Sequence, residues 1–169
     1  HRQHYYAGAD ISRRLGQMAG DIDPAARQVR RDEGALLHWD KLALTTGTEP
    51  IRLPAAVGGK LDGVYAVRTL ADVDAMAGEF QPGRRALIVG GGYIGLEAAA
   101  VAAGKGLAVT VVEQAPRILQ RVAEPETADY VRALHQSHGV KILENVGLGR
   151  RDGDGGRAHA ACRQNGERL

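Results

Sequence analysis

The sequence contains a single cysteine among 169 residues, Cys162, which excludes an internal disulfide and a cysteine-rich zinc site. It also lacks an excess of one charge, since 22 Lys and Arg against 20 Asp and Glu give a net charge of +2. Without a block of five or six like charges, nothing indicates nucleic-acid binding. No apolar run approaches the roughly 18 residues of a membrane span and no signal peptide opens the chain, so we expect a soluble, cytoplasmic protein without a membrane partner.

Glycine, in contrast, is abundant. The chain has 23 Gly, about twice the usual share. They cluster in the run Gly90–Gly92 and around residues 153–156. Since a compact domain has about 100 to 200 residues, the length predicts one domain or one and a fraction. The clustered glycines must therefore serve tight turns or a ligand.

Strand and helix patterns alternate along the second half of the chain. Strand, helix, strand, helix, strand is the order of a βαβ series, which requires a parallel sheet with right-handed crossovers. We therefore predict an α/β, Rossmann-like nucleotide-binding domain that also carries a β-hairpin. The expected strands are 64–67, 85–89, 107–112 and 140–143, the expected helices are 70–80, 94–103 and 124–138, and one hairpin arm is 158–162.

The first part of the chain has a different pattern. Residues 21–47 indicate β-structure with turns, and the short apolar run Leu42–Thr46, stopped by Gly47, predicts a buried strand. The stretch 48–63 is interrupted by Pro and Gly-Gly and is typical of a linker. We therefore divide the chain into residues 1–53, part of a first domain, and residues 54–169, a nearly complete nucleotide-binding domain.

The loop after the strand 85–89 carries the pattern G-x-G-x-x-G at Gly90, Gly92 and Gly95. The first glycine permits a tight turn, the second lets the backbone approach a pyrophosphate, and the third lets helix and strand pack closely. An acid, Glu113, closes the second strand 23 residues after Gly90, close to the spacing of dinucleotide-binding sites. A tight turn that binds nothing is the alternative, which the combination of strand, loop, helix and acid disfavours.

Glu113 predicts which dinucleotide is bound. Its carboxylate can accept both hydroxyl protons of an adenosine ribose but would repel a 2′-phosphate, so we expect NADH to be preferred over NADPH. Arg117 and Arg121 follow at i+4 and i+8; they are either ordinary surface arginines or hold the adenosine or a phosphate. The residues leave two alternatives for Glu97: it lies on a solvated helix face, or it has a functional role.

Other chemistries find less support. His135 and His138 are spaced i, i+3 on one expected helix, but no acid or cysteine completes a metal set, so we expect no metal site. No G-x-S-x-G sequence occurs, and a serine hydrolase is therefore not supported.

Three ordered motifs together resemble a known family. They are the segment Asp40–Pro50 with its Thr46-Gly47, the segment Val67–Asp72, and the segment Val89–Glu97. In this order they are similar to the FAD-dependent, NADH-using ferredoxin reductases, the putidaredoxin reductase and rhodocoxin reductase group within the pyridine nucleotide-disulfide oxidoreductases. The resemblance covers nearly the whole chain from about Ile11. Thr45 stands where the family usually has Ala, and Ala19 where it usually has Val.

The resemblance implies a role for individual residues. It implies NADH at the glycine-rich loop, with Glu113 and Arg121 beside it and Glu97 near the nicotinamide as the catalytic residue. It implies that Arg68 touches the flavin of FAD, and that the strand end and a backbone contact to the adenine help to bind FAD. The implied NADH loop is Gly90, Gly91, Gly92, Tyr93, Ile94 and Gly95, and the other implied FAD positions are Thr46, Gly47 and Ala19.

The resemblance also implies an activity: hydride transfer from NADH to FAD, then electron transfer to a ferredoxin-type iron–sulfur protein. The family opens with its own G-x-G-x-x-G for FAD and closes with a Gly-Asp flavin motif, so we expect this chain to be a central fragment, inactive alone. A related reductase with another acceptor, such as rubredoxin, oxygen, nitrite or a disulfide, stays open. So does a stand-alone NAD-binding module without flavin, although the strand ending at Thr46-Gly47 argues against it.

Overall fold

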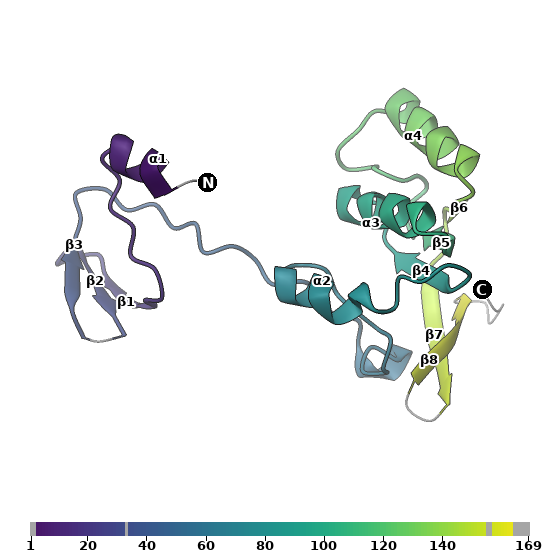
Figure 1. Ribbon diagram of the computed structural model, residues 1–169, viewed down its shortest axis with the longest axis horizontal. Helices are drawn as coiled ribbons and strands as arrows, with labels where there is room; N and C mark the ends of the chain where they lie inside the picture. The colour runs from purple at the N-terminus through teal and green to yellow at the C-terminus, as the bar shows by residue number, and fades with distance from the viewer. Residues whose placement is uncertain (1–2, 33, 155–156, 164–169) are drawn as a thin grey trace. The chain divides into compact units, whose positions relative to one another are not determined.

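The computed structural model describes residues 3–32, 34–154 and 157–163, and its chain forms two compact units, His1–Gly47 and Thr48–Leu169 (Figure 1). The first unit is a small antiparallel sheet with one short helix. Its turn between the first two strands is set by Asp23, whose Oδ1 accepts hydrogen bonds from the amides of Ala25 (2.9 Å) and Ala26 (3.0 Å). The elements are α1 (Gln3–Gly8), β1 (Ala19–Asp23), β2 (Gln28–Arg31) and β3 (Leu36–His38), in the sheet order β1-β2-β3.

The buried strand expected over Leu42–Thr46 is absent, and this prediction was wrong. The segment has no regular structure, and Leu44 is 63% exposed. A strand needs a neighbouring strand to satisfy its backbone N–H and C=O groups. None of the described strands pairs with these residues, so the apolar β-type run stays irregular.

The second unit contains the predicted parallel sheet. β4 pairs in parallel with β5, with Arg85 opposite Ala108, and β5 pairs in parallel with β6, with Thr110 opposite Lys141. α3 packs on β4 and β5, and α4 packs on β6. The strands of this sheet are β4 (Arg85–Val89), β5 (Ala108–Val112) and β6 (Lys141–Leu143), and the crossover helices are α3 (Tyr93–Gly104) and α4 (Pro125–Ser137). The α/β, Rossmann-like fold class is therefore confirmed.

The core lies between this sheet and its helices. Leu96, Ala99 and Ala102 recur every three residues on α3 and are buried, which gives the helix an apolar face against the strands. On β5, Val111 and Val112 point to opposite faces and are both fully buried. A strand that is buried on both faces typically has a continuous apolar run of this kind.

The second unit has further elements outside this sheet. The β7–β8 hairpin is antiparallel, and its second arm matches the expected one. The strand expected at Val64–Val67 is absent: the Val64 amide donates to the Leu61 carbonyl in a turn (3.2 Å), and no strand pairs with the segment among the described residues. Further elements are η1 (Ala55–Val57), α2 (Leu70–Ala77), β7 (Leu148–Asp154) and β8 (Arg157–Arg163). None of the helices in the described ranges is long and apolar enough to cross a membrane.

Candidate functional site

The loop between β4 and α3 begins with the tight turn expected at its first glycine. Gly90 has φ +111°, a conformation that L side chains rarely adopt, and its amide donates to the Val112 carbonyl at the end of β5 (2.8 Å). The turn therefore starts at the carboxyl edge of the parallel sheet, where α/β folds bind their ligands.

The next three glycines of the loop have different surroundings. A Cβ on Gly95 would lie 2.1 Å from the Gly90 carbonyl oxygen, so only glycine lets α3 approach the strand this closely. A Cβ on Gly91 would lie 2.6 Å from Cγ2 of Ile118. At Gly92 a Cβ would meet nothing within 4 Å and would project into open space. Gly91 and Gly95 are thus required by packing inside the protein, whereas Gly92 leaves room for something outside it.

The amino end of α3 presents unoccupied donors at this loop. Gly92 is the N-cap residue, and no side chain caps the helix. The first amides of a helix lack intrahelical partners, and the helix dipole favours a negative group beside them. Tyr93 and Ile94 in the first turn are 58% and 62% exposed. These amides and the open side of Gly92 fit the pyrophosphate of a dinucleotide.

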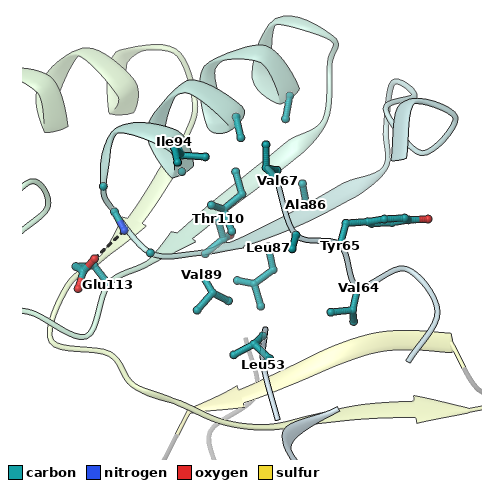
Figure 2. Close-up of a pocket in the computed structure, with 18 of the residues that line it drawn as sticks. Leu53, Val64, Tyr65, Val67, Ala86, Leu87, Val89, Ile94, Thr110 and Glu113 are labelled. Carbon is teal, nitrogen blue, oxygen red and sulfur yellow. Dashed lines mark hydrogen bonds between the residues drawn. The ribbon is translucent and has the colours of Figure 1, made fainter. Parts of the chain in front are cut away.

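Glu113 is hydrogen-bonded to the glycine-rich loop. Its Oε2 accepts from the Gly91 amide and its Oε1 from the Ala115 amide, both at 2.7 Å, and the side chain is half-buried (Figure 2). An ionised carboxylate has about four lone-pair sites, so both oxygens can still accept ribose hydroxyls. Glu113 therefore holds the loop in place and lies where the sequence expects it to meet a ribose.

A broad groove of about 1500 Å³ runs past this loop within the second unit. The loop, Glu113 and Arg121 line one part of it. Another part is apolar, with Leu87 and Val89 of β4 near Leu53 in Figure 2. A polar anion-binding end continuous with an apolar stretch suits a ligand that has a pyrophosphate and planar rings.

The two arginines after Glu113 behave differently. Arg117 donates through one guanidinium nitrogen to the Ala123 carbonyl (2.7 Å) and through the other to the Gln120 carbonyl (3.4 Å), so it shapes its own loop. Arg121 lines the groove, is exposed, and makes no hydrogen bond or ion pair with the described residues. Arg121 is therefore the arginine available to a ligand.

The other expected site residues lie outside the groove. Glu97 is exposed on the second turn of α3 and does not line the groove. Arg68 donates through Nε to the Thr48 carbonyl (2.7 Å) just before α2. Ala19, Thr46 and Gly47 belong to the first unit, where Ala19 begins β1. The structure thus brings the glycine-rich loop, Glu113 and Arg121 together, and not the remaining residues.

The two histidines of α4 have local partners. The ring nitrogens of His135 lie 2.9 Å from the Val131 carbonyl and 3.1 Å from the Leu96 carbonyl, which links α4 to α3. Nδ1 of His138 lies 2.9 Å from the Leu134 carbonyl. Within the described ranges no group of three or more His, Cys, Asp or Glu side chains is placed to hold a metal ion.

Sequence reasoning missed Glu144, which supports the loop that flanks the site. Its Oε1 accepts from the Ile118 amide (2.7 Å) and from the guanidinium of Arg132 (3.0 and 3.1 Å). The signal was available: Glu144 directly follows β6, as Glu113 directly follows β5. An acid at the carboxyl edge of a parallel sheet lies on the ligand side of the fold.

Comparisons with known proteins match this chain to one family. The model for the pyridine nucleotide-disulphide oxidoreductases matches residues 4–169. The chain is 37% identical over 151 residues to the ferredoxin–NAD(+) reductase component of a biphenyl dioxygenase system from Paraburkholderia xenovorans, covering 89% of this chain and 37% of that protein. It is 33% identical to a rubredoxin–NAD(+) reductase from Pseudomonas putida, covering 98% of this chain and 43% of that protein.

A solved structure has the same fold. The putidaredoxin reductase in a covalent complex with putidaredoxin superimposes with a TM-score of 0.82 at 30% identity, covering 100% of this chain and 42% of that one. The chain therefore spans about two fifths of the length of these three relatives.

Proposed function

Because the chain belongs to the pyridine nucleotide-disulphide oxidoreductase family, we propose that it is the NADH-binding part of an FAD-dependent NADH:ferredoxin reductase. In this function a hydride from NADH passes to FAD, and electrons then pass to a ferredoxin-type iron–sulfur protein. The reductase from the biphenyl dioxygenase system supports the assignment. The observation that carries it is the hydrogen bond that the Gly91 amide donates to Glu113, beside the open side of Gly92. This arrangement offers an acid for the ribose and a cradle for the pyrophosphate.

This chain's residues bind and orient NADH in the proposal. The amides at the start of α3 receive the pyrophosphate, Glu113 accepts the ribose hydroxyls, and Arg121 lies beside them. The apolar stretch of the groove along β4 takes the nicotinamide and excludes water from it. We keep Glu97 as the candidate residue near the nicotinamide, on the strength of the family resemblance alone.

FAD is assigned on the family, and the residues proposed for it form no cradle of their own. Arg68 already donates Nε to the Thr48 carbonyl, and Thr46 and Gly47 lie in an irregular segment. The chain also has only one G-x-G-x-x-G, which is the one proposed for NADH. The chemical roles given to this chain therefore concern NADH. On the strength of the family resemblance alone, we propose that Arg68, Thr46, Gly47 and Ala19 contribute to FAD binding. We also propose that residues 1–53 belong to an FAD-type domain and residues 54–169 to the NADH domain.

One relative favours a second acceptor. The rubredoxin–NAD(+) reductase matches 98% of this chain at 33% identity. Rubredoxin is therefore the alternative to a ferredoxin. Steady-state reduction of each acceptor by the whole protein that carries this chain separates the two: a kcat/KM higher for rubredoxin than for a two-iron ferredoxin would overturn the ferredoxin assignment.

The cytoplasmic location remains a prediction.

Calorimetric titration of the chain with NADH and with NADPH tests the proposed function. Because a 2′-phosphate would face the Glu113 carboxylate, NADH should bind at least about tenfold more tightly than NADPH. A variant that loses a carboxylate elsewhere serves as a control. Glu126→Gln removes an exposed carboxylate from the first turn of α4, away from the groove residues, and should leave both affinities unchanged. Equal affinities for the two nucleotides in the unsubstituted chain would contradict the proposal.

A further inference from the structure

The segment 117–119 contacts the glycine-rich loop through its backbone. The Leu119 amide donates to the Gly91 carbonyl (2.9 Å), while the Gly91 amide donates to Glu113. Both polar groups of Gly91 are therefore engaged, which fixes the peptide plane that leads into Gly92. Ile118, fully buried, packs directly against Gly91. The orientation of the amides that open α3 therefore depends on where residues 118 and 119 lie.

The backbone of this segment does not hold its shape by local preference. Leu119 has φ +53°, in the left-handed region that non-glycine residues rarely adopt. A strained residue persists only where its surroundings over-determine it. Arg117 holds the later part of the loop by donating to the Ala123 and Gln120 carbonyls. The Ile118 amide, however, is held from outside the loop.

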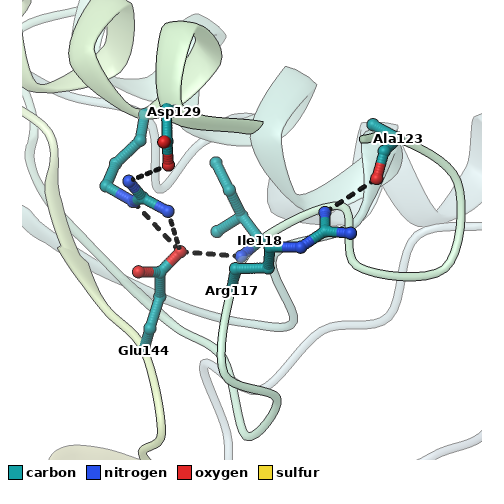
Figure 3. Close-up of polar contacts among 6 residues, drawn as sticks. Arg117, Ile118, Ala123, Asp129 and Glu144 are labelled. Carbon is teal, nitrogen blue, oxygen red and sulfur yellow. Dashed lines mark hydrogen bonds and ion pairs between the residues drawn. The ribbon is translucent and has the colours of Figure 1, made fainter. Parts of the chain in front are cut away.

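That outside contact is Glu144, which directly follows β6 and forms an ion pair with Arg132 of α4 (Figure 3). Glu144 accepts from the Ile118 amide at 2.7 Å through the same oxygen that receives the Arg132 guanidinium. The side chains of Glu144 and Arg132 are only 18% and 24% exposed, so solvent screens the pair less than it would a surface pair. Arg132 also pairs with Asp129 (2.7 Å), which is 65% exposed.

We propose that Glu144, oriented by Arg132, is a positioning residue for the dinucleotide site: through the Ile118 amide it places Leu119, and through Leu119 it sets the Gly91 peptide and the amides that receive the pyrophosphate. This rests on the proposed NADH function. Glu144 does not line the groove, and it accepts its hydrogen bond from the Ile118 amide and not from the glycine-rich loop. A neutral or shorter side chain at position 144 would not fully replace the charged acceptor of the Ile118 amide.

The test compares three variants of the chain. Glu144→Ala removes the acceptor, Glu144→Gln keeps an oxygen for the Ile118 amide without the charge, and Asp129→Asn is the matched control because it removes only the exposed partner of Arg132. NADH affinity by calorimetry should fall about tenfold in Glu144→Ala, recover at least partly in Glu144→Gln, and stay within about twofold of the original in Asp129→Asn. Hydrogen exchange at the Leu119 amide should accelerate in Glu144→Ala and not in the control.

A purely stabilising role would predict a different result. Glu144→Ala would then melt at a lower temperature, yet bind NADH as tightly as the original chain wherever it is folded and keep slow exchange at Leu119. That result overturns the inference. If Glu144→Ala does not fold, Arg132→Gln replaces it: weaker NADH binding supports the inference and unchanged affinity overturns it. Failure of the unsubstituted chain to bind NADH would overturn the proposed function instead. Hydrogen exchange at the Leu119 amide would then still test whether Glu144 positions Leu119.

Discussion

At the residue scale, the glycines of one short loop serve separate purposes. Gly90 supplies a backbone conformation, Gly91 and Gly95 supply space that neighbouring protein atoms occupy, and Gly92 supplies space that the protein leaves open. Sequence reasoning assigned Gly90 and Gly95 these roles, and the structure confirms the geometry of both. The tight packing of Gly91 against Ile118 could not be predicted, because it joins residues 27 positions apart through a turn with an unusual backbone.

Paired alanine substitutions separate packing from ligand space. Gly95→Ala places a Cβ against the Gly90 carbonyl oxygen and should lower the free energy of unfolding by about 1–3 kcal/mol. Gly92→Ala places a Cβ in open space at an ordinary φ of −82° and should change it by no more than about 0.5 kcal/mol. Gly92→Ala should nevertheless weaken NADH binding about tenfold, because its Cβ points where the pyrophosphate is expected.

Chemical denaturation and calorimetry on both variants measure these effects. A large loss of stability in Gly92→Ala, or NADH binding as tight as in the original chain, would contradict the assignment of its open side to the pyrophosphate.

Glu113 illustrates a residue with two roles of which the sequence shows one. Its spacing from Gly90 predicted a ribose contact, whereas its bonds to the Gly91 and Ala115 amides appear only in the fold. Replacing Glu113 with Ala therefore removes two charge-assisted hydrogen bonds as well as the expected ribose acceptor. A selectivity experiment needs a substitution that keeps an acceptor for the loop.

Glu113→Gln combined with Gln114→Arg should move preference towards NADPH. The amide oxygen of Gln can still accept from one of the two backbone amides, the repulsion of a 2′-phosphate disappears, and an arginine at the exposed position 114 can pair with that phosphate. We expect the ratio of NADH to NADPH affinity to fall by at least about tenfold, measured by calorimetry. The single variant Gln114→Arg is the control, and a ratio unchanged in the double variant would refute the role of Glu113.

At the element scale, the sequence predicts the helices and strands that are stabilised by nearby residues or whose apolar pattern fits only one type of secondary structure. The strands and crossover helices of the parallel sheet all form where expected: β4, α3, β5, α4 and β6. The apolar pattern of each one shows which of its faces is buried against its neighbours. The runs at 42–46 and 64–67 have the same composition as strands but no strand to pair with among the described residues. Whether an apolar run becomes a strand depends on whether another strand pairs with it, and the residues of the run do not show this.

The amino end of α2 makes a prediction about pH. Thr69 and Asp72 form a reciprocal capping box, in which hydrogen bonds from the Thr69 backbone amide and then its hydroxyl lower the pKa of Asp72 below its usual 3.8. Because the pKa of Asp72 is lower in the folded state, its contribution to stability is present above the unfolded pKa and is lost as pH falls through the folded pKa. Thr69→Ala should raise the pKa of Asp72 by removing its hydroxyl donor.

Carbon-detected NMR titration of the Asp72 carboxyl in both proteins measures that pKa. The loss of the Thr69 cap should also reduce stability by about 1 kcal/mol at neutral pH. An Asp72 pKa that is the same with and without the Thr69 hydroxyl would show that the box does not form in solution.

At the scale of the whole molecule, every residue that lines the groove belongs to the unit Thr48–Leu169. NADH binding should therefore be a property of that unit. Residues 48–169 produced alone should bind NADH within about twofold of the full chain, measured by the same calorimetry. Gly92→Ala in the shortened chain is the control for specific binding, and loss of affinity on removing residues 1–47 would show that the first unit contributes to the NADH site.

FAD gives the complementary expectation. The chain has a single G-x-G-x-x-G, which the proposal gives to NADH, so the 169-residue chain should hold FAD poorly. Gel filtration after incubation with excess FAD should yield nearly colourless protein. A yellow protein with one FAD per chain would contradict this expectation and would place a second nucleotide cradle among residues that the present proposal leaves without one.

In the proposed function, NADH binds at the loop between β4 and α3 beside Glu113. Amide chemical shifts of the 169-residue chain, followed during titration with NADH, test it most directly. We predict that the largest shifts fall on Gly91, Gly92, Tyr93 and Ile94 and on the amides next to Glu113, and that Gly92→Ala raises the NADH concentration needed to produce them about tenfold. Saturable shifts that leave these amides in place and cluster elsewhere, or no saturable shifts at all, would contradict it.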